Sequence, residues 1–467
     1  MSPEQVVEEL DRIGAPATMA IAGPRFFGFV NSSALPAALA ANWLSTAWEQ
    51  HGGFAVSSPG STTLELVALR WTIELLGLPH DSAGGFVTGT TVADMTCLAA
   101  ARHSVLARVG WDADSDGLFG APPITVVVSA ETHSTLFKAL GFVGLGRNRV
   151  VKVPVDSQGR MRADALPGIA GPTIVCLQAG NVNTGAFDPF TVVIRHVRAS
   201  GAPAWVHVDG AFGLWARVAP ARAYLVEGVE LADSWATDAH KWLNSPYDCG
   251  MAIVRDGDML RAAMALNAAY FPSDRANQTD YTPEGSRRPR GVDAWAALRG
   301  LGRTGLADLV ERNCRMAKRF ADALSAAGFP VLNDVVLNQA LVWFGSAERT
   351  RQVVAAIQEE GTCWAGVTVW QGRTAMRVSV FSWATTDTDV DRSIAAILRI
   401  AWLNCLVLPH RPALAAAGEN SATLCVCRSP SAQPFVVPVV PDGPGGDDHG
   451  LPQGLGCGRS ARGMEDG

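Results

Sequence analysis

The 467-residue sequence has no excess of positive charge and no long apolar run. Lys and Arg number 38 against 44 Asp and Glu, and no Lys/Arg block has the density that a sequence-independent nucleic-acid binder needs. No apolar run approaches the ~20 residues of a membrane span. The first twenty residues carry Glu4, Glu8, Glu9 and Asp11, whereas a signal peptide has basic and apolar stretches. We therefore expect no nucleic-acid partner, no membrane attachment and a cytoplasmic location.

Metal-binding and nucleotide-binding motifs are also missing. The 9 cysteines show no metal-ligand spacing, and Cys425-x-Cys427 has no second pair at a suitable distance. The cysteine spacing therefore predicts no metal site. Neither G-x-x-x-x-G-K-[ST] nor a G-x-G-x-x-G after a strand occurs, so the sequence gives no support for nucleotide binding. The cysteines of the main body are expected to be reduced and mostly buried: Cys97, Cys176, Cys249, Cys314 and Cys363.

What the chain does contain is a repeated pattern of apolar strand, loop and helix after residue 86. Strands are expected at 124–128, 150–153, 173–177, 204–208, 234–237 and 251–254. Their apolar residues are continuous rather than alternating, which indicates burial on both faces and hence a mainly parallel sheet covered by helices. Ligands of such sheets bind outside the carboxyl ends of the strands.

Helical spacing and composition divide the rest of the chain. Helices are expected at 3–14, 36–50, 62–76, 92–109, 132–140, 292–301 and 308–327. Ser61-Thr62-Thr63 is the expected cap of the helix at 62–76. Strands near 340–344 and 376–380 predict a smaller α/β unit. The expected parts are an N-terminal helical segment (1–60), a large domain (61–300), a small C-terminal domain (301–403) and a disordered tail rich in Pro, Gly and Ala (404–467).

Lys241 lies between two strands that read as buried. Burial disfavours the ammonium form, so this lysine must lose its charge or find a partner. It is a candidate Schiff-base nucleophile, and a surface lysine on a loop is the alternative.

Three further features follow strands. A Gly/Thr turn with Thr90 and Thr91 opens into a helix, and it either binds a phosphate or merely caps the helix. His133 either lies over a pocket floor or is structural. Asp209 ends a buried strand and needs a cationic or N–H partner, with a structural ion pair as the alternative. His207-x-Asp209 also suggests a metal site, but the two side chains point to one face only if the strand continues through Asp209.

Together these features describe a cofactor site. A phosphate cradle, an imidazole that stacks on a ring, a buried carboxylate and a Schiff-base lysine match the phosphate, ring face, pyridinium nitrogen and aldehyde of pyridoxal 5'-phosphate. The conjunction is far more specific than any one feature.

The residues resemble group II pyridoxal-phosphate-dependent decarboxylases, which include aromatic-amino-acid and glutamate decarboxylases, over about 24–397. The motifs that carry the resemblance are Asp238-Ala239-His240-Lys241-Trp242-Leu243-Asn244, His207-Val208-Asp209-Gly210-Ala211-Phe212-Gly213, and His133 ahead of Lys138-Ala139-Leu140-Gly141. The resemblance implies an α/β fold of type I with a mainly parallel seven-stranded sheet. It also implies a homodimer with shared active sites, in which the segment 1–60 packs on the partner.

The resemblance also implies roles for single residues. Lys241 would form the Schiff base, Asp209 would pair with the pyridinium nitrogen and His133 would stack on the ring. The cofactor-binding residues would be Thr90, Thr91, His133, Asp209, Ala211, Asp238, His240 and Lys241. Relatives usually have Gly-Thr-Glu-Ala-Asn in the phosphate turn, but here the glutamate position is Val92 and the asparagine position is Asp94.

The polar stretch 273–290 suits a mobile lid. Its Tyr281 resembles the tyrosine associated with proton return in this family, and a surface turn residue is the alternative. Residues 286–288 would reach the partner's cofactor. Arg377 either anchors a substrate carboxylate or ends a strand in an ion pair, and we favour the ion pair.

The predicted activity is decarboxylation of an L-amino acid to an amine and carbon dioxide. An aromatic or other apolar substrate is favoured because Phe26, Phe27, Phe29 and Trp370 are expected near the site. A lyase, an aldehyde-forming deaminase and an aminotransferase on the same fold are alternatives, and stacking by His133 disfavours the aminotransferase. A catalytically dead scaffold is a further alternative, which the retained Lys241 argues against.

Overall fold

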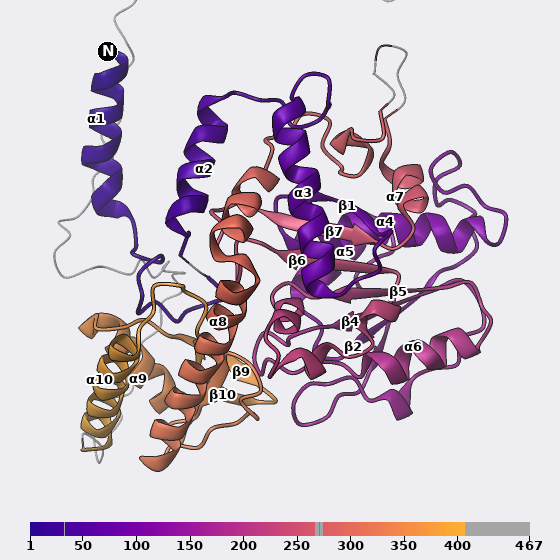
Figure 1. The fold of residues 1–467 in the computed structure, drawn as a ribbon. Helices are drawn as coiled ribbons and strands as arrows, with labels where there is room; N and C mark the ends of the chain where they lie inside the picture. The colour runs from indigo at the N-terminus through magenta and orange to yellow at the C-terminus, as the bar shows by residue number, and fades with distance from the viewer. Residues whose placement is uncertain (32, 267–269, 271–273, 407–467) are drawn as a thin grey trace, which may run out of the picture. The chain divides into compact units, whose positions relative to one another are not determined.

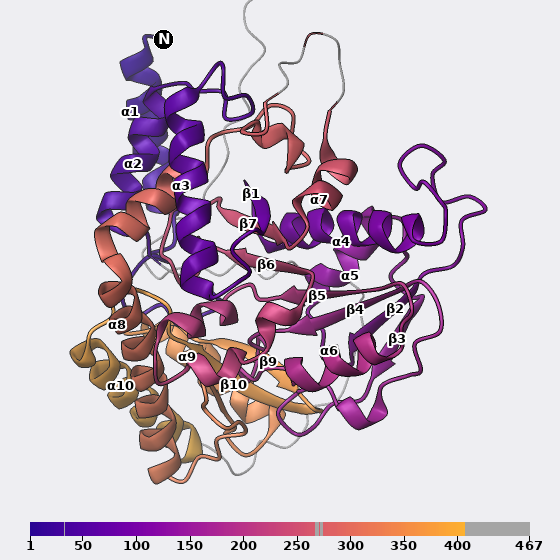
Figure 2. The same cartoon turned by 45° about the vertical axis from the view of Figure 1, so that its right-hand side comes forward.

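A seven-stranded sheet carries most of the fold; Figure 1 labels its strands except β3 (Val150–Val153), which Figure 2 labels. The structure is a computed structural model that describes residues 1–31, 33–266, 270 and 274–406. The tail expected to be disordered lies outside the described residues from 407 onward, as does Cys425-x-Cys427. The strands follow the order β1 (Ala83–Val87), β7 (Gly250–Val254), β6 (Ser234–Asp238), β5 (Ala204–Asp209), β4 (Thr173–Gln178), β2 (Thr125–Ser129) and β3 (Val150–Val153).

The sheet is mixed but mostly parallel. The strands from β6 to β3 pair in parallel, whereas β7 runs antiparallel to both β1 and β6. This confirms the predicted sheet, and all six expected strands are present. The strand that the sequence did not place is β1, where Gly84 and Gly85 weaken the strand signal because glycine has a low β-propensity.

Helices cover both faces of the sheet, and β4 to β7 are buried at every position. One face packs against α3 (Pro59–Leu76), α6 (Phe190–Ala199) and α8 (Gly291–Ala326). The other packs against α4 (Thr90–Ala107), α5 (Ser134–Phe142) and α7 (Gly257–Met264). Figure 2 shows α4 and α6 on opposite sides of the strands. Polar side chains that bind a ligand are therefore confined to the ends of the strands.

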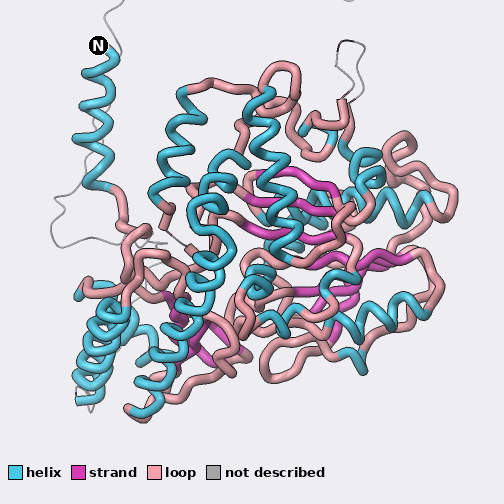
Figure 3. The backbone as a smooth tube through the Cα atoms, in the orientation of Figure 1, coloured by secondary structure: helices cyan, strands magenta, loops and turns pink. Residues whose placement is uncertain are grey.

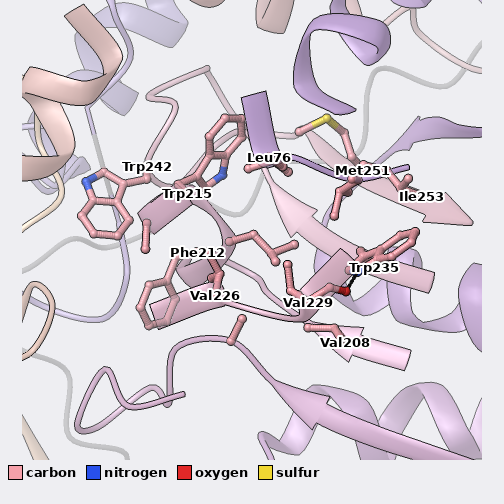
Figure 4. Packing of buried hydrophobic residues seen from close by; sticks show 14 of the residues in the cluster. Leu76, Val208, Phe212, Trp215, Val226, Val229, Trp235, Trp242, Met251 and Ile253 are labelled. Carbon is pink, nitrogen blue, oxygen red and sulfur yellow. Dashed lines mark hydrogen bonds between the residues drawn. The ribbon is translucent and has the colours of Figure 1, made fainter. Parts of the chain in front are cut away.

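Three buried tryptophans fill the core on the α3 side (Figure 4). Each indole N–H has an acceptor: Trp235 donates to the carbonyl of Val229 at 2.9 Å, Trp215 to the carbonyl of Asp238 at 3.2 Å, and Trp242 to Asn313 Oδ1 at 3.0 Å. These bonds offset the cost of burying a polar N–H group.

A second, three-stranded antiparallel sheet follows, and Figure 3 shows its strands apart from those of the large sheet. Its order is β8 (Gln339–Val342), β10 (Arg373–Ser379) and β9 (Gly366–Trp370), packed with α9 (Ala347–Glu360) and α10 (Asp387–Leu406). The two strands expected here are present, and β9 is additional. The division of the chain into domains stays a prediction.

Helix boundaries differ from expectation by two or three residues at α4 and α5, which were expected at 92–109 and 132–140, and at the start of α3. α8 is interrupted at Gly302, with φ 61°, which separates the two helices expected at 292–301 and 308–327. The cap expected at Ser61-Thr62-Thr63 is wrong, because α3 begins at Pro59. A proline at the first helical position is pre-organised for the helix, so it sets the start.

The N-terminal part holds α1 (Pro3–Gly14) and α2 (Pro36–Ala47). α1 matches its expected range, but none of its residues is buried. The short 3-10 helices are η1 (Ala15–Ala17), η2 (Ala163–Ala165), η3 (Gly213–Val218), η4 (Ala223–Val226), η5 (Val229–Leu231) and η6 (Gln278–Asp280). No helix in the described part of the chain is both long and apolar enough to cross a membrane. The five main-body cysteines are free and buried, as expected.

Arg287 is enclosed within the fold. Its guanidinium lies 2.7 Å from the carboxylate of Glu65, and neither side chain has exposed surface. It also donates to the carbonyls of Gly52 and Phe86. The terminal guanidinium nitrogens of Arg287 are thus engaged within the chain, and the expectation that residues 286–288 reach the partner's cofactor stays a prediction.

Replacing Arg287 with methionine is expected to lower the free energy of unfolding by about 3–5 kcal/mol, because Glu65 is left as an unpaired buried charge. Urea unfolding checks this. Arg303→Met is the control, since the pair of Arg303 with Glu74 is 63% and 65% exposed, and pairs of this kind contribute less than about 1 kcal/mol. Equal losses in both variants would contradict the assignment.

Candidate active site

A cavity of about 410 Å³ opens at the carboxyl ends of β4, β5 and β6. Seven of the residues predicted for the site line it: Thr90, Thr91, His133, Asp209, Ala211, His240 and Lys241. They come from the ends of different strands and from the turns and helix starts that follow them. The structure thus brings together residues that lie far apart in the sequence, at the edge where parallel strands place their ligands.

Lys241 lies in the turn between β6 and β7. Its Nζ is 2.8 Å from Asp238 Oδ2, and its side chain is 20% exposed. The ammonium therefore has the partner that its burial demands, and it faces the cavity. The alternative of a surface lysine is wrong.

Asp238 joins Lys241 to the start of α4. Its carboxylate accepts the backbone N–H of Thr90 at 2.7 Å and the Thr90 hydroxyl at 2.5 Å. Burial alone would raise the pKa of Asp238, but Lys241, His240 and Thr90 together hold it below its ordinary value. The Thr90 hydroxyl, predicted as a phosphate donor, is thus engaged by Asp238, while Thr91 lines the cavity.

The helix start approaches the loop of Lys241 closely. A Cβ atom at Gly89 would lie 3.2 Å from the ring of His240 and 3.5 Å from Asp238 Oδ1. Glycine therefore leaves room at the mouth of the first turn, where backbone N–H groups and the helix dipole attract an anion.

His133 caps α5 and lines the cavity. Its Nδ1 lies 2.7 Å from Thr135 Oγ1, which orients the half-buried ring. Burial lowers the pKa of His133, and the nearby Asp209 opposes this shift. His133 therefore has a structural role at the start of α5 and also faces the cavity, so the two interpretations of this residue are compatible.

Asp209 is the last residue of β5 and is 5% exposed. Its Oδ1 accepts the backbone N–H of Ala211 at 3.2 Å, and it forms no salt bridge with any described residue. Burial raises its pKa, and His133 and Lys241 oppose the rise. The alternative of a structural ion pair is therefore wrong, and the carboxylate faces the cavity in need of a cation.

The strand continues through Asp209, so His207 shares its face of the sheet. His207 Nε2 lies 3.1 Å from Asp94 Oδ1, beneath the cavity. The described residues His103, Asp112 and Asp114 have ligand atoms close enough for a metal ion, but they lie elsewhere, and two of the three are exposed.

Tyr281 does not line this cavity. Its hydroxyl donates to the carbonyl of Arg275 at 3.1 Å, and its ring borders a different cavity of about 720 Å³ beside α3. Its role as a proton donor stays a prediction, which requires a movement of the loop or a second copy of the chain.

Arg377 lines the cavity, and the ion pair favoured for it is wrong: it forms no salt bridge within the described ranges. It donates to the carbonyl of Val182 at 3.1 Å and to Asn183 Oδ1 at 3.3 Å. Burial lowers its pKa to about 10. The strand pattern around Arg377 could not show this, because the neighbouring carbonyl comes from a distant loop.

Of the aromatic residues expected at the site, only Phe29 lines the cavity. Phe26 stacks on Trp364 with ring centroids 4.8 Å apart, and Phe27 packs against Phe320 with ring centroids 4.9 Å apart, so both side chains serve packing. Trp370 is buried in a separate small cluster.

Tyr247 is a lining residue that the sequence reasoning missed. Its hydroxyl donates to Asn31 Oδ1 at 2.8 Å, and its ring lies 4.5 Å from that of His240. Its position six residues after Lys241, in a chain with only 4 tyrosines, was the available signal.

The comparisons with known proteins agree with this geometry. A family model described as the pyridoxal-dependent decarboxylase conserved domain matches residues 2–344. The chain belongs to this family. Among curated relatives, tryptophan decarboxylase 1 of Oryza sativa subsp. japonica is 31% identical over 80% of each chain. Phenylacetaldehyde synthase of Arabidopsis thaliana is 27% identical over 83% of this chain and 84% of its own.

A solved structure of Oryza sativa TDC with PLP and tryptamine superposes with a TM-score of 0.80 and 26% identity, over 86% of this chain and 89% of that one. The predicted family and fold type are therefore confirmed, as are pyridoxal 5'-phosphate as the cofactor and amino-acid decarboxylation as the reaction.

The two threonines of the first turn of α4 are expected to respond differently to replacement by valine. Thr90→Val removes a buried hydrogen bond to a charged group and is expected to cost about 1.5–3 kcal/mol of stability. Thr91→Val is expected to weaken cofactor binding about tenfold, as the loss of one hydrogen bond to a charged phosphate. Urea unfolding and titration with pyridoxal 5'-phosphate measure the two effects. A stability loss confined to Thr91→Val would refute the assignment.

Proposed function

We propose that the protein decarboxylates an L-amino acid with an aromatic or other apolar side chain to its amine and carbon dioxide. The observation that carries this is the convergence on one cavity of Lys241, the ring of His133 and the buried Asp209, which forms no salt bridge with a described residue. The similarity to tryptophan decarboxylase 1 supports the aromatic substrate.

The residues of the cavity fit pyridoxal 5'-phosphate. Lys241 supplies the amine that would hold it covalently, and the start of α4 with Thr91 would hold its phosphate. Asp209, which lacks a cationic partner among the described side chains, would face the ring nitrogen and keep a proton there. His133 would cover one face of the ring. When bound, the cofactor supplies an electron sink for the carbanion that remains after carbon dioxide leaves.

The cavity wall has one apolar and one cationic part. Phe29, Val30 and Val182 contribute apolar surface, whereas the guanidinium of Arg377 offers donors to an anion. We propose that the substrate side chain lies against the apolar part and that Arg377 binds the carboxylate.

A homodimer with shared active sites is part of the proposal. On α2 and just after it, Trp43, Leu44 and Trp48 are 66%, 54% and 48% exposed. Apolar surface of this kind marks an interaction site. A second copy would also offer its Tyr281 to a cavity that the residue does not reach in its own chain. The five free, buried cysteines support the proposed cytoplasmic location, where thiols stay reduced.

Aldehyde formation is the second candidate; it would consume dioxygen, which is reduced to hydrogen peroxide while the substrate nitrogen leaves as ammonia. It is favoured by the similarity to phenylacetaldehyde synthase. Amine, aldehyde and carbon dioxide, measured together with aromatic amino acids, distinguish the two: decarboxylation yields amine and carbon dioxide in equal amounts.

The lysine assignment is tested by reduction with borohydride. Wild-type protein mixed with pyridoxal 5'-phosphate is expected to retain the cofactor covalently after reduction, because the Lys241 amine reacts with its aldehyde. Lys241→Ala is expected to release all of it on denaturation. Mass spectrometry of the reduced chain locates the label. A label on another lysine would disprove the role of Lys241.

Arg377→Met is expected to raise the KM for the amino acid about tenfold or more, because the loss of a hydrogen-bonded charge costs roughly 1.5–3 kcal/mol. Arg373→Met on the same strand is the control, since Arg373 is exposed and lies over Trp343. Steady-state kinetics and cofactor titration measure the effects. An unchanged KM in Arg377→Met would exclude the carboxylate contact.

A further inference from the structure

A second buried carboxyl lies behind Asp209. Asp94 on α4 has no exposed surface, and its Oδ1 lies 3.1 Å from Nε2 of His207. Its Oδ2 has no hydrogen-bond partner among the residues that the structure describes. His207 and Asp209 project from the same face of β5, since they are two residues apart on one strand. Asp94 therefore adds a carboxyl group to the same side of the sheet as the cavity.

The surroundings of His207 accommodate Asp94 in either charge state. His207 Nδ1 lies 2.9 Å from the hydroxyl of Ser234, which also accepts the indole N–H of Trp205 at 2.8 Å. If Asp94 is ionised, His207 donates from Nε2 and accepts the Ser234 proton at Nδ1. If Asp94 is protonated, it donates to Nε2, and Nδ1–H donates to Ser234. Only hydrogen atoms move between these two arrangements.

The charges around Asp94 decide which state prevails. Burial, Asp209 and Asp238 raise its pKa well above the ordinary value, and Lys241 opposes them. Burial lowers the pKa of His207 to about 3, so the imidazole stays neutral. Burial also raises the pKa values of two nearby thiols, those of Cys97 on α4 and Cys176 on β4. A cation that faces Asp209 would shift Asp94 toward its ionised form, because opposite charge favours a carboxylate.

We propose that Asp94 is a positioning residue for the cofactor: with Asp209 it supplies the negative charge that keeps a proton on the ring nitrogen. The inference rests on the proposed function, in which that nitrogen faces Asp209. Asp94 itself does not line the cavity, so its negative charge acts on the ring nitrogen electrostatically and not by direct contact.

Asp94→Asn tests this, because asparagine keeps the shape and the acceptor for His207 but cannot carry charge. The probes are pyridoxal 5'-phosphate and its 1-deaza analogue, in which a carbon replaces the ring nitrogen. The affinity for pyridoxal 5'-phosphate is expected to fall about tenfold, which corresponds to one pKa unit of coupling. The affinity for the analogue is expected to stay unchanged. The pH at which the bound cofactor's absorbance titrates is expected to fall, because the ring loses its proton more easily.

Stability without cofactor separates this role from a structural one. Because the pKa of Asp94 is raised in the folded state, its contribution to stability is present below its unfolded pKa and is lost as pH rises through the folded pKa. An asparagine side chain cannot ionise, so Asp94→Asn is expected to unfold at the same or a higher temperature than wild type at high pH. A merely structural role predicts that Asp94→Asn unfolds at a lower temperature and loses affinity for both ligands equally. That result would overturn the proposal.

Asp233→Asn is the matched control. Asp233 lies just before β6, at the end of the strand opposite to Asp238. Its carboxylate accepts hydrogen bonds from the backbone N–H of Val206 at 2.7 Å and from Arg198 Nη2 at 2.6 Å. It is expected to lose stability without any change in the cofactor titration. If wild type binds both ligands and Asp94→Asn matches it in every measurement, the inference alone fails. If wild type binds neither ligand, the proposed function fails with it.

Discussion

The carboxylate of Asp238 connects the end of β6 with the start of α4 and with Lys241. It ends β6, receives the backbone N–H and hydroxyl of Thr90, and lies 2.8 Å from the ammonium of Lys241. A carboxylate with only 2% exposure and no partner would strongly destabilise the fold, because burial removes its hydration. Because Thr90 at the start of α4 and Lys241 in the following turn both contact this carboxylate, the end of β6, the start of α4 and Lys241 are held close together.

The buried sheet explains why the chemistry gathers at this edge. β4, β5, β6 and β7 are covered on both faces, so their middle positions take mainly apolar side chains. Polar groups that meet solvent or a ligand belong at the strand ends. Among these groups Asp209 differs from Asp238: the one hydrogen bond that its carboxylate forms with the described residues comes from a backbone N–H. A carboxylate held in that state suits a cationic ligand, in agreement with the pyridoxal-dependent family to which the chain belongs.

The sequence predicts strands and strand-end residues where a continuous apolar run is followed directly by a polar residue. Continuous apolar runs placed six strands of the large sheet, and Lys241, Asp209 and His133 follow such runs directly. The pattern failed at β1, whose two glycines carry no side-chain signal and whose strand character comes from pairing with β7. It failed again at Arg377, where the carbonyl of Val182, a partner 195 positions away, replaces the expected carboxylate.

The sequence by itself determined the class of fold, the family and the residue types of the site, because local apolar periodicity and short motifs are properties of neighbouring residues. Only the tertiary structure decided how the donors are shared: Thr90 serves Asp238, Arg287 serves Glu65, and Tyr281 lies outside the cavity of its own chain. The physical reason is that a buried polar group takes whichever partner the packed chain brings within hydrogen-bond distance, and that distance is independent of separation in sequence.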